Sequence, residues 1–86
     1  MKVEVRLFGT YKEAAKTSVL QEELTGVVTL GGLLEKLRKR YGGTFENLHD
    51  ANSGVLILRN ADITRELDLK LADGDVVKLV PAVPGG

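Results

Sequence analysis

The sequence predicts an α+β domain in which a mixed sheet of four to five strands carries one main helix on one face. Three observations favour this class. The chain has 86 residues, which suits one small domain with a single modest core. Only the stretch from Leu30 to Tyr41 has sustained helical periodicity, whereas several short runs alternate as strands do. A lone helix must bury its apolar stripe against the sheet.

Charge and composition narrow the function classes. Twelve basic and 12 acidic residues leave no net charge that favours nucleic acid or an anionic membrane surface. The chain has no cysteine, so it offers neither a disulfide nor a catalytic thiol. Its uncharged runs fall short of the roughly 18 residues of a membrane span, and its first residues lack the apolar core of a signal peptide. We expect a cytoplasmic protein without nucleic-acid or membrane partners.

The first strand is predicted from the alternation of Val3, Val5 and Leu7 with charged residues. Phe8 breaks this pattern because it falls on the polar side. It is either a residue at the end of the sheet that a loop covers, or part of an exposed contact patch. The first is the commoner case, because single apolar residues near a surface need no special explanation.

A short helical turn and a second strand are expected next. Thr10 and Glu13 have the spacing of a capping box, which predicts a turn of helix through Ala15. Residues 17–24 are predicted to form a weaker strand, because three consecutive polar residues dilute its alternation. Gly26 marks the turn that follows it.

The main helix is predicted from a single apolar stripe. Its members are spaced at i, i+3, i+4, i+7 and i+11: Leu30, Leu33, Leu34, Leu37 and Tyr41. Thr29 is suited to cap the start of the helix, and Gly42-Gly43 to end it. The basic residues of the last turn suit the negative end of the helix dipole, so they need no nucleic-acid partner to explain them. Gly31 and Gly32 would allow a close contact between helix and sheet.

The segment 44–54 is polar and rich in turn residues, with Phe45 and Leu48 as anchors beneath it. His49 is the only histidine of the chain, and no cysteine or carboxylate cluster stands near it at the spacing of metal ligands. We therefore interpret His49 as a solvated loop residue, and we predict no metal site.

Two further strands complete the predicted fold. The continuous apolar run 55–58 is typical of a strand buried on both faces. Asn60-Ala61 turns the chain into a short extended segment, 63–67. Asp73-Gly74-Asp75 is a strong turn signal, and residues 76–80 form the last strand. With the first and last strands as central neighbours, this arrangement is a β-grasp, or ubiquitin-like, fold.

The domain is predicted to span residues 1–80, and residues 81–86 to form an extended tail. The tail has no charged side chain, carries two prolines that favour extended backbone, and stops on two glycines. Such a tail suits a narrow channel through which its terminal carboxylate must pass; a frayed end is the alternative. Because the chain shows no catalytic constellation and no phosphate-binding glycine motif, we expect a substrate, carrier or binding module, not an enzyme by itself.

Over its whole length the chain resembles the MoaD-type sulfur carriers, the small subunits of molybdopterin synthase, which are related to ThiS and to ubiquitin. The resemblance rests on the opening strand, the turn at 13–15, the helix and, above all, the run from Leu71 through Asp-Gly-Asp to the Gly-Gly end. The length favours MoaD over the shorter ThiS. Two positions depart from the family: Ala61 stands where glycine is common, and Pro84 replaces a more flexible residue.

The resemblance implies that the chemistry takes place at Gly86. An ATP-using activating enzyme of the MoeB type would adenylate the Gly86 carboxylate, and sulfur from a separate donor would convert the acyl-adenylate into a thiocarboxylate. A large MoaE-type subunit would then accept the tail and use its sulfur to build the molybdopterin that holds molybdenum or tungsten. No cofactor would be bound by the carrier, since ATP belongs to the activating enzyme.

The remaining site residues are expected to bind the partners, the tail because the family's tail enters a channel and Phe8 because it is out of phase beside an uncharged tail. Pro81, Val83 and Gly85 are expected to dock the tail in the partner's channel. Phe8 and Leu79 are expected to extend the tail into one apolar surface, which would bind first the activating enzyme and then the large subunit.

Two other functions stay open. A ubiquitin-like modifier would use the same activated Gly86, but a lysine of a target protein would attack it in place of sulfide. A β-grasp binding module with incidental glycines would need no ATP-dependent chemistry, and its interaction would lie on a sheet or helix face.

Overall fold

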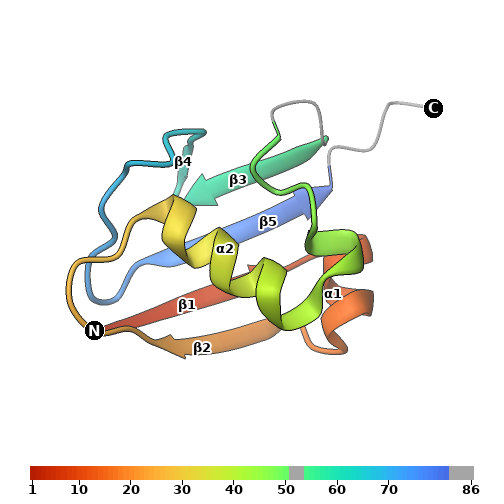
Figure 1. Ribbon diagram of the computed structural model, residues 1–86, viewed down its shortest axis with the longest axis horizontal. Coiled ribbons are helices and arrows are strands. Elements are labelled where there is room, and N and C mark those ends of the chain that lie inside the picture. Colours follow the sequence, from red (N-terminus) through yellow and green to blue (C-terminus); the bar gives the residue numbers. More distant parts are fainter. Residues whose placement is uncertain (51–53, 82–86) are drawn as a thin grey trace.

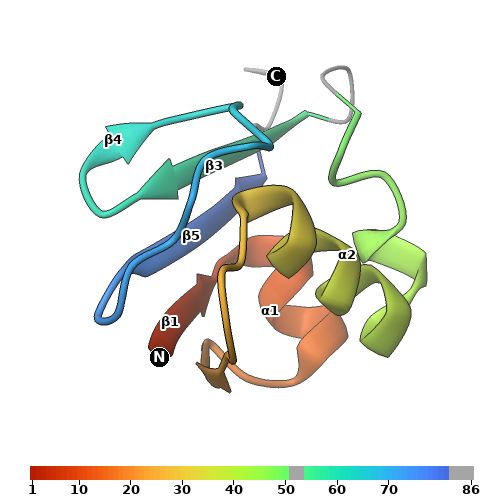
Figure 2. The same ribbon diagram turned by 60° about the vertical axis from the view of Figure 1, so that its left-hand side comes forward.

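The computed structural model describes residues 1–50 and 54–81 as a five-stranded sheet with its helices on one side (Figures 1 and 2). The elements in chain order are β1 (Lys2–Leu7), α1 (Gly9–Ala15), β2 (Val19–Glu23), α2 (Leu30–Tyr41), the 3₁₀ turn η1 (Gly43–Phe45), β3 (Val55–Arg59), β4 (Asp62–Ile63) and β5 (Val76–Pro81). The strand order in the sheet is β2-β1-β5-β3-β4. The predicted α+β class and β-grasp arrangement are confirmed.

The first and last strands are central neighbours, as predicted. β1 and β5 run parallel, with Val5 opposite Val77 and Leu7 opposite Leu79, whereas the other strand pairs are antiparallel. Parallel neighbours need a long crossover, and here the rest of the chain, including α2, provides it. This topology brings the end of β5 beside the end of β1.

The main helix packs on the sheet as its periodicity predicted. The stripe and the strand residues beneath it are all at most 1% exposed: Leu30, Leu33, Leu34, Leu37, Val3, Val5, Leu7, Ile57, Val77 and Leu79. The Thr29 side chain accepts a hydrogen bond from the Gly32 N–H (3.1 Å), which confirms the predicted cap. At the other end the Gly42 N–H donates to the Arg38 carbonyl (2.8 Å), and Gly42 ends the helix with a φ of +60°.

The capping box predicted at Thr10 and Glu13 is wrong. α1 begins at Gly9, and its cap is Phe8, whose carbonyl accepts the N–H of Tyr11 (3.1 Å). Since the chain already turns into the helix at Gly9, Thr10 lies inside the first turn and its side chain caps nothing. β2 is also shorter than predicted, from Val19 to Glu23.

β3 is not buried on both faces. Val55 and Ile57 are buried, whereas Leu56 and Leu58 between and after them are only partly buried. The physical reason is that helices cover a single face of the sheet in the described part of the chain (Figure 2). We call the side opposite α2 the open face.

The close contact at Gly31 also differs from the expectation. A side chain there would approach the Leu67 carbonyl oxygen within 3.1 Å, so the helix fits tightly against the segment after β4 and not against the sheet. The N–H groups of Leu30 and Gly31 donate to the carbonyls of Leu69 (2.8 Å) and Leu67 (2.9 Å). This segment therefore satisfies the first amides of α2, which otherwise lack partners inside a helix.

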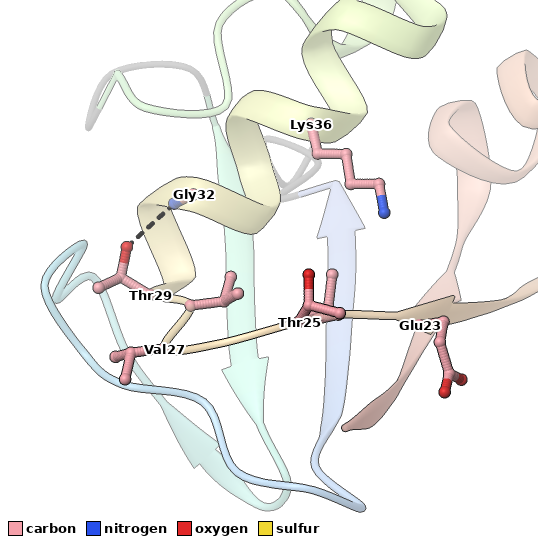
Figure 3. Close-up of a pocket in the computed structure, with 8 residues that line it drawn as sticks. Glu23, Thr25, Val27, Thr29, Gly32 and Lys36 are labelled. Atoms are coloured by element: carbon pink, nitrogen blue, oxygen red, sulfur yellow. Dashed lines mark hydrogen bonds between the residues drawn. The ribbon is translucent and has the colours of Figure 1, made fainter.

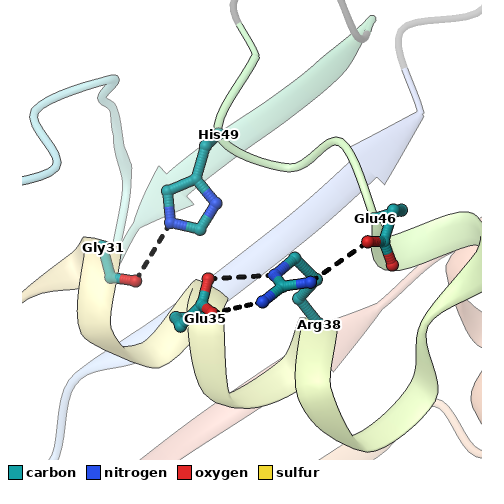
Figure 4. Close-up of polar contacts among 5 residues, drawn as sticks. All are labelled: Gly31, Glu35, Arg38, Glu46 and His49. Carbon is teal, nitrogen blue, oxygen red and sulfur yellow. Dashed lines mark hydrogen bonds and ion pairs between the residues drawn. The ribbon is translucent and has the colours of Figure 1, made fainter.

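The polar segment after α2 is held by buried anchors and by charged contacts. Phe45 and Leu48 are at most 1% exposed, as predicted. Arg38 pairs with Glu35 (Nη2–Oε1 2.5 Å) and with Glu46 (Nη1–Oε1 3.1 Å), as Figure 4 shows. The hydrogen bond from Arg38 lowers the pKa of Glu35 below its ordinary value.

His49 lies in this segment and is exposed, in agreement with its interpretation as a loop residue. Its Nε2 lies 3.2 Å from the Gly31 carbonyl oxygen (Figure 4). The contact ties the loop to the first turn of α2 and gives the histidine a structural role. No helix within residues 1–50 or 54–81 is long and apolar enough to cross a membrane.

Candidate functional site

β5 carries the chain to the end of the sheet where the tail begins. Its last residues are held from both sides, because the Phe8 N–H donates to the Leu79 carbonyl (3.2 Å) and Pro81 pairs with Val55. β5 extends to Pro81, one residue beyond the predicted end of the strand. We call Phe8, Gly9 and Pro81 the tail root. Ala82 to Gly86 lie outside the described residues, so the roles of Val83, Gly85 and Gly86 remain predictions.

Gly9 is a site residue that sequence reasoning missed. Its φ is +55°, a conformation that side chains other than glycine rarely adopt. A Cβ at this position would lie 2.6 Å from Cγ of Pro81, which no real contact tolerates. The ring of Pro81 therefore rests directly on Gly9. The signal in the sequence was a glycine immediately after the first strand, at the end where a parallel last strand also finishes.

The structure separates the two residues predicted to form the partner surface. Phe8 is 42% exposed, so the interpretation that a loop covers it is wrong and the contact-patch alternative stands. Leu79 is fully buried in the core, so its assignment to the surface is also wrong. Successive strand residues point to opposite faces. Leu79 faces α2, and the next residue, Val80, faces the open side.

Phe8 has two apolar neighbours on the open face. Val80 stands directly opposite Leu56 in the β3–β5 pair. Because Leu7 is opposite Leu79, Phe8 is next to Val80 across the β1–β5 pair. We call Phe8, Leu56 and Val80 the open-face patch. It lies at the end of the sheet from which the tail departs.

The Asp-Gly-Asp turn has a structural explanation. Asp75 is 7% exposed and accepts hydrogen bonds from the Ala72 N–H (2.8 Å) and from the Asn60 side-chain amide (3.2 Å). Asn60 in turn accepts the N–H of Val76 (3.0 Å) and has φ at +55°. A type I′ turn needs positive φ at both central residues, and Ala61 does not have it. The alanine is therefore accommodated by a different turn.

At the candidate site, the described residues offer a firmly positioned backbone and apolar side chains. Across residues 1–50 and 54–81, no group of three or more His, Cys, Asp or Glu is placed to hold a metal ion. The distinctive features are the tail root and the partly exposed open-face patch beside it.

Comparison with known proteins identifies the family. The model of the ThiS family matches residues 5–86, which include both the tail root and the terminal Gly85-Gly86. The chain belongs to the ThiS family. This is the group of ubiquitin-like sulfur carriers and small modifiers that the Asp-Gly-Asp turn and the Gly-Gly end indicated.

Relatives within this group carry two kinds of names. "Small archaeal modifier protein 3" of Haloferax volcanii is 29% identical over 92 residues, covering all of both chains. The structure of a putative molybdopterin converting factor subunit 1 from Pyrococcus furiosus is 28% identical, with a TM-score of 0.82 over 96% of this chain and 99% of that one. A chain in the complex of subunits 1 and 2 of molybdopterin-converting factor from Helicobacter pylori is 30% identical, with full coverage of both and a TM-score of 0.66.

Proposed function

We propose that this member of the ThiS family is a cytoplasmic sulfur carrier, and that it donates sulfur as the small subunit of a molybdopterin synthase. In this proposal the Gly86 carboxylate is adenylated and then converted into a thiocarboxylate. The observation that carries the proposal is the family match through Gly86, on a domain whose last strand ends beside a partly exposed apolar patch.

The terminal carboxylate supplies chemistry that the side chains of this chain lack. A carboxylate is a poor electrophile, but its attack on the α-phosphorus of ATP releases pyrophosphate and gives an acyl-adenylate. A sulfide equivalent then attacks the acyl carbon, and AMP leaves. The two glycines suit this route because a side chain beside the reacting carbon would obstruct a narrow channel. The catalytic groups would belong to the partners, so this chain acts as carrier and not as enzyme.

The partners expected are a MoeB-type activating enzyme, a sulfur donor and a MoaE-type large subunit. The open-face patch is suited to bind the two proteins in turn, because exposed apolar residues grouped near a reacting terminus are typical of interaction surfaces. The Helicobacter pylori relative, whose structure contains subunits 1 and 2 together, supports a large-subunit partner for this chain.

A second function is favoured by a specific relative. The Haloferax volcanii protein that matches the full length of this chain is named a small archaeal modifier. In a modifier the ε-amine of a target lysine attacks the activated Gly86 and forms an isopeptide bond. Activation is common to both functions, and the acceptor distinguishes them.

The test is mass spectrometry of the intact protein after incubation with its cognate activating enzyme, ATP and a sulfur donor. The carrier proposal predicts the mass gain of one oxygen-to-sulfur exchange, confined to the C-terminal peptide. Deletion of Gly86 should abolish the gain while circular dichroism shows an unchanged fold. A gain that survives the deletion would contradict the proposal. Isopeptide-linked lysines found without any thiocarboxylate would favour the modifier.

A further inference from the structure

A pocket lies far from the tail root, on the α2 side of the sheet. It has a volume of about 410 Å³ and is formed by the end of β2, the loop that follows and the first turns of α2 (Figure 3). Its lining includes apolar and polar side chains and one cation: Leu24, Val27, Val28, Thr29, Gly32 and Lys36. Leu24 exchanges hydrogen bonds with Met1 at the start of β1. The tail root stands at the other end of β1.

The pocket is open at Gly32, because this residue has no side chain. A Cβ built there would meet only Val28 and Thr29, both at 3.5 Å, so nothing fills the space above it. Val27 beside it is 79% exposed. The pocket therefore presents apolar surface to solvent, with Lys36 at one side and its ammonium group directed toward β2 in Figure 3.

The outer edge of β2 ends at this pocket. The described residues cover only part of the outward-facing backbone N–H and C=O groups of β2. β2 is the outermost strand, and it bonds to β1 at alternate residues such as Ser18 and Leu24. The residues between them turn their N–H and C=O groups outward. Thr17 covers the first of these, since its hydroxyl accepts the Val19 N–H (3.3 Å) and donates to the Val19 carbonyl (3.0 Å).

Gln21 and Glu23 are the next outward-facing residues. In the described part of the chain no element lies beside them on the outer side of β2. An uncovered strand edge is a template for another extended chain. The edge is thus protected at one end by Thr17 and open at the other, where the pocket begins.

The side of α2 that faces β2 carries an excess of positive charge. Glu22 is buried. Its Oε1 lies 2.9 Å from Nη1 of Arg40, and its Oε2 lies 3.9 Å from Nζ of Lys36. Two cations on successive turns of α2 therefore share one carboxylate. Glu23 also borders the pocket, but its side chain points to the other side of β2 (Figure 3). This arrangement favours a ligand with an acidic group.

We propose that β2 and this pocket bind an extended acidic segment of a partner protein as an additional strand. One apolar side chain of the segment fills the pocket beside Leu24. An acidic residue two positions away, on the same face and roughly 7 Å along the strand, then meets Lys36 and Arg40. Strand addition of this kind combines backbone hydrogen bonds with a side-chain pocket.

The proposed site is independent of the sulfur-carrier function. It lies at the opposite end of β1 from the tail root and on the opposite side of the sheet from the open-face patch, so a partner can bind there while the tail is engaged. A second copy of this chain is a poorer occupant. Antiparallel pairing of two β2 strands would bring Glu23 of both copies close together on the face of β2 that carries neither Lys36 nor Arg40, and like charges across strands destabilise pairing.

The probe is the peptide acetyl-Thr-Asp-Thr-Ile-Thr-Asp-Thr-amide, which reads the same in both directions and so needs no assumption about strand orientation. We expect saturable binding with a Kd at or below about 1 mM. Backbone NMR of the full chain, titrated with the peptide, measures it. The shifted amides should be those of Gln21, Glu23, Val28 and Gly32, and those of Phe8 and Val80 should not move.

Two matched changes test the parts of the site separately. Replacing both aspartates of the peptide with lysine should weaken binding at least about tenfold, and Lys36→Glu should reduce or reverse that preference. Gly32→Leu should fill the pocket and abolish binding while retaining the helix, because leucine is a better helix former than glycine.

Several results would overturn the proposal. One is no saturable binding at several millimolar peptide, and another is amide shifts confined to the open-face patch. Equal affinity for the acidic and basic peptides would remove the role of Lys36 and Arg40. Concentration-dependent pairing of two chains through β2 would identify a second copy as the occupant.

Discussion

The two faces of the sheet differ although the same strands build them. Leu7 and Leu79 point toward α2 and are at most 1% exposed. Their immediate neighbours Phe8 and Val80 point the other way, next to Leu56, and stay partly exposed. Burial stabilises the fold on the first face, whereas apolar side chains on the second remain in contact with water. A one-residue step along a strand therefore separates residues that hold the fold from residues available to a partner.

The largest effect is expected on the covered face. Leu37→Ala should lower the free energy of unfolding by about 2–5 kcal/mol, because Leu37 is fully buried and the change leaves a cavity. Ile63→Ala is the matched control on the open face, where Ile63 is 66% exposed; it should change stability by no more than about 0.5 kcal/mol. Denaturant unfolding measures both. Similar losses for the two variants would break the distinction between the faces.

Substitution at the tail root should have an intermediate effect, because it introduces both backbone strain at residue 9 and a steric clash with Pro81. Gly9→Ala forces an alanine to a φ of +55° and drives its Cβ against Pro81. Gly26→Ala introduces similar strain at a φ of +73° but meets nothing within 4 Å. We expect Gly9→Ala to be the more destabilising variant and to slow thiocarboxylate formation roughly tenfold or more, since displacement of a reacting group is costly.

A double variant isolates the contact itself. Gly9→Ala/Pro81→Ala removes the ring carbon that the new methyl group would strike, so it should recover part of the rate lost by Gly9→Ala. Equal rates for Gly9→Ala and Gly26→Ala would show that the contact between Gly9 and Pro81 does not position the tail.

The smallest effect is expected from the charged network on the outer side of α2. The hydrogen bond from Arg38 lowers the pKa of Glu35 in the folded state, so Glu35 stabilises the fold above its unfolded pKa. That contribution is lost as the pH falls below the ordinary glutamate value of about 4.3. Glu35→Gln should therefore be slightly less stable than the parent at neutral pH and equal to it in acid. Thermal unfolding at several pH values measures the difference, and a difference that does not vary with pH would contradict the assignment.

The sequence was informative where a pattern is local and repeated. The stripe from Leu30 to Leu37 predicted the helix and its buried face, because its spacing depends only on helical geometry. Thr29 predicted the helix start for the same reason, since its side chain reaches an amide of the following turn. The central position of β1 beside β5 followed from having one helix and several strands to place.

Features that depend on distant parts of the chain could not be read in this way. The contact between Gly9 and Pro81 joins opposite ends of the sequence, and nothing local marks it. The burial of β3 on both faces was predicted from its continuous apolar run alone, although a single helix could cover only one face of the sheet. Leu79 was expected both beneath the helix and on the partner surface, and only the first holds, because side chains alternate between the two faces of a strand and Leu79 faces α2. Residues 82–86, which carry the proposed reaction, remain predictions from their sequence and family.

The most direct test of the division between the two faces is Phe8→Ala, measured for stability and for activation on the same sample. Phe8 is 42% exposed, so its loss should change the free energy of unfolding by about 1 kcal/mol or less. The KM of the cognate activating enzyme for this chain should rise roughly tenfold, as for a residue at the centre of an interface. Ile63→Ala should alter neither quantity. A loss of several kcal/mol with an unchanged KM would make Phe8 a core residue, and that result would contradict the division between a covered face that holds the fold and an open face that binds the partner.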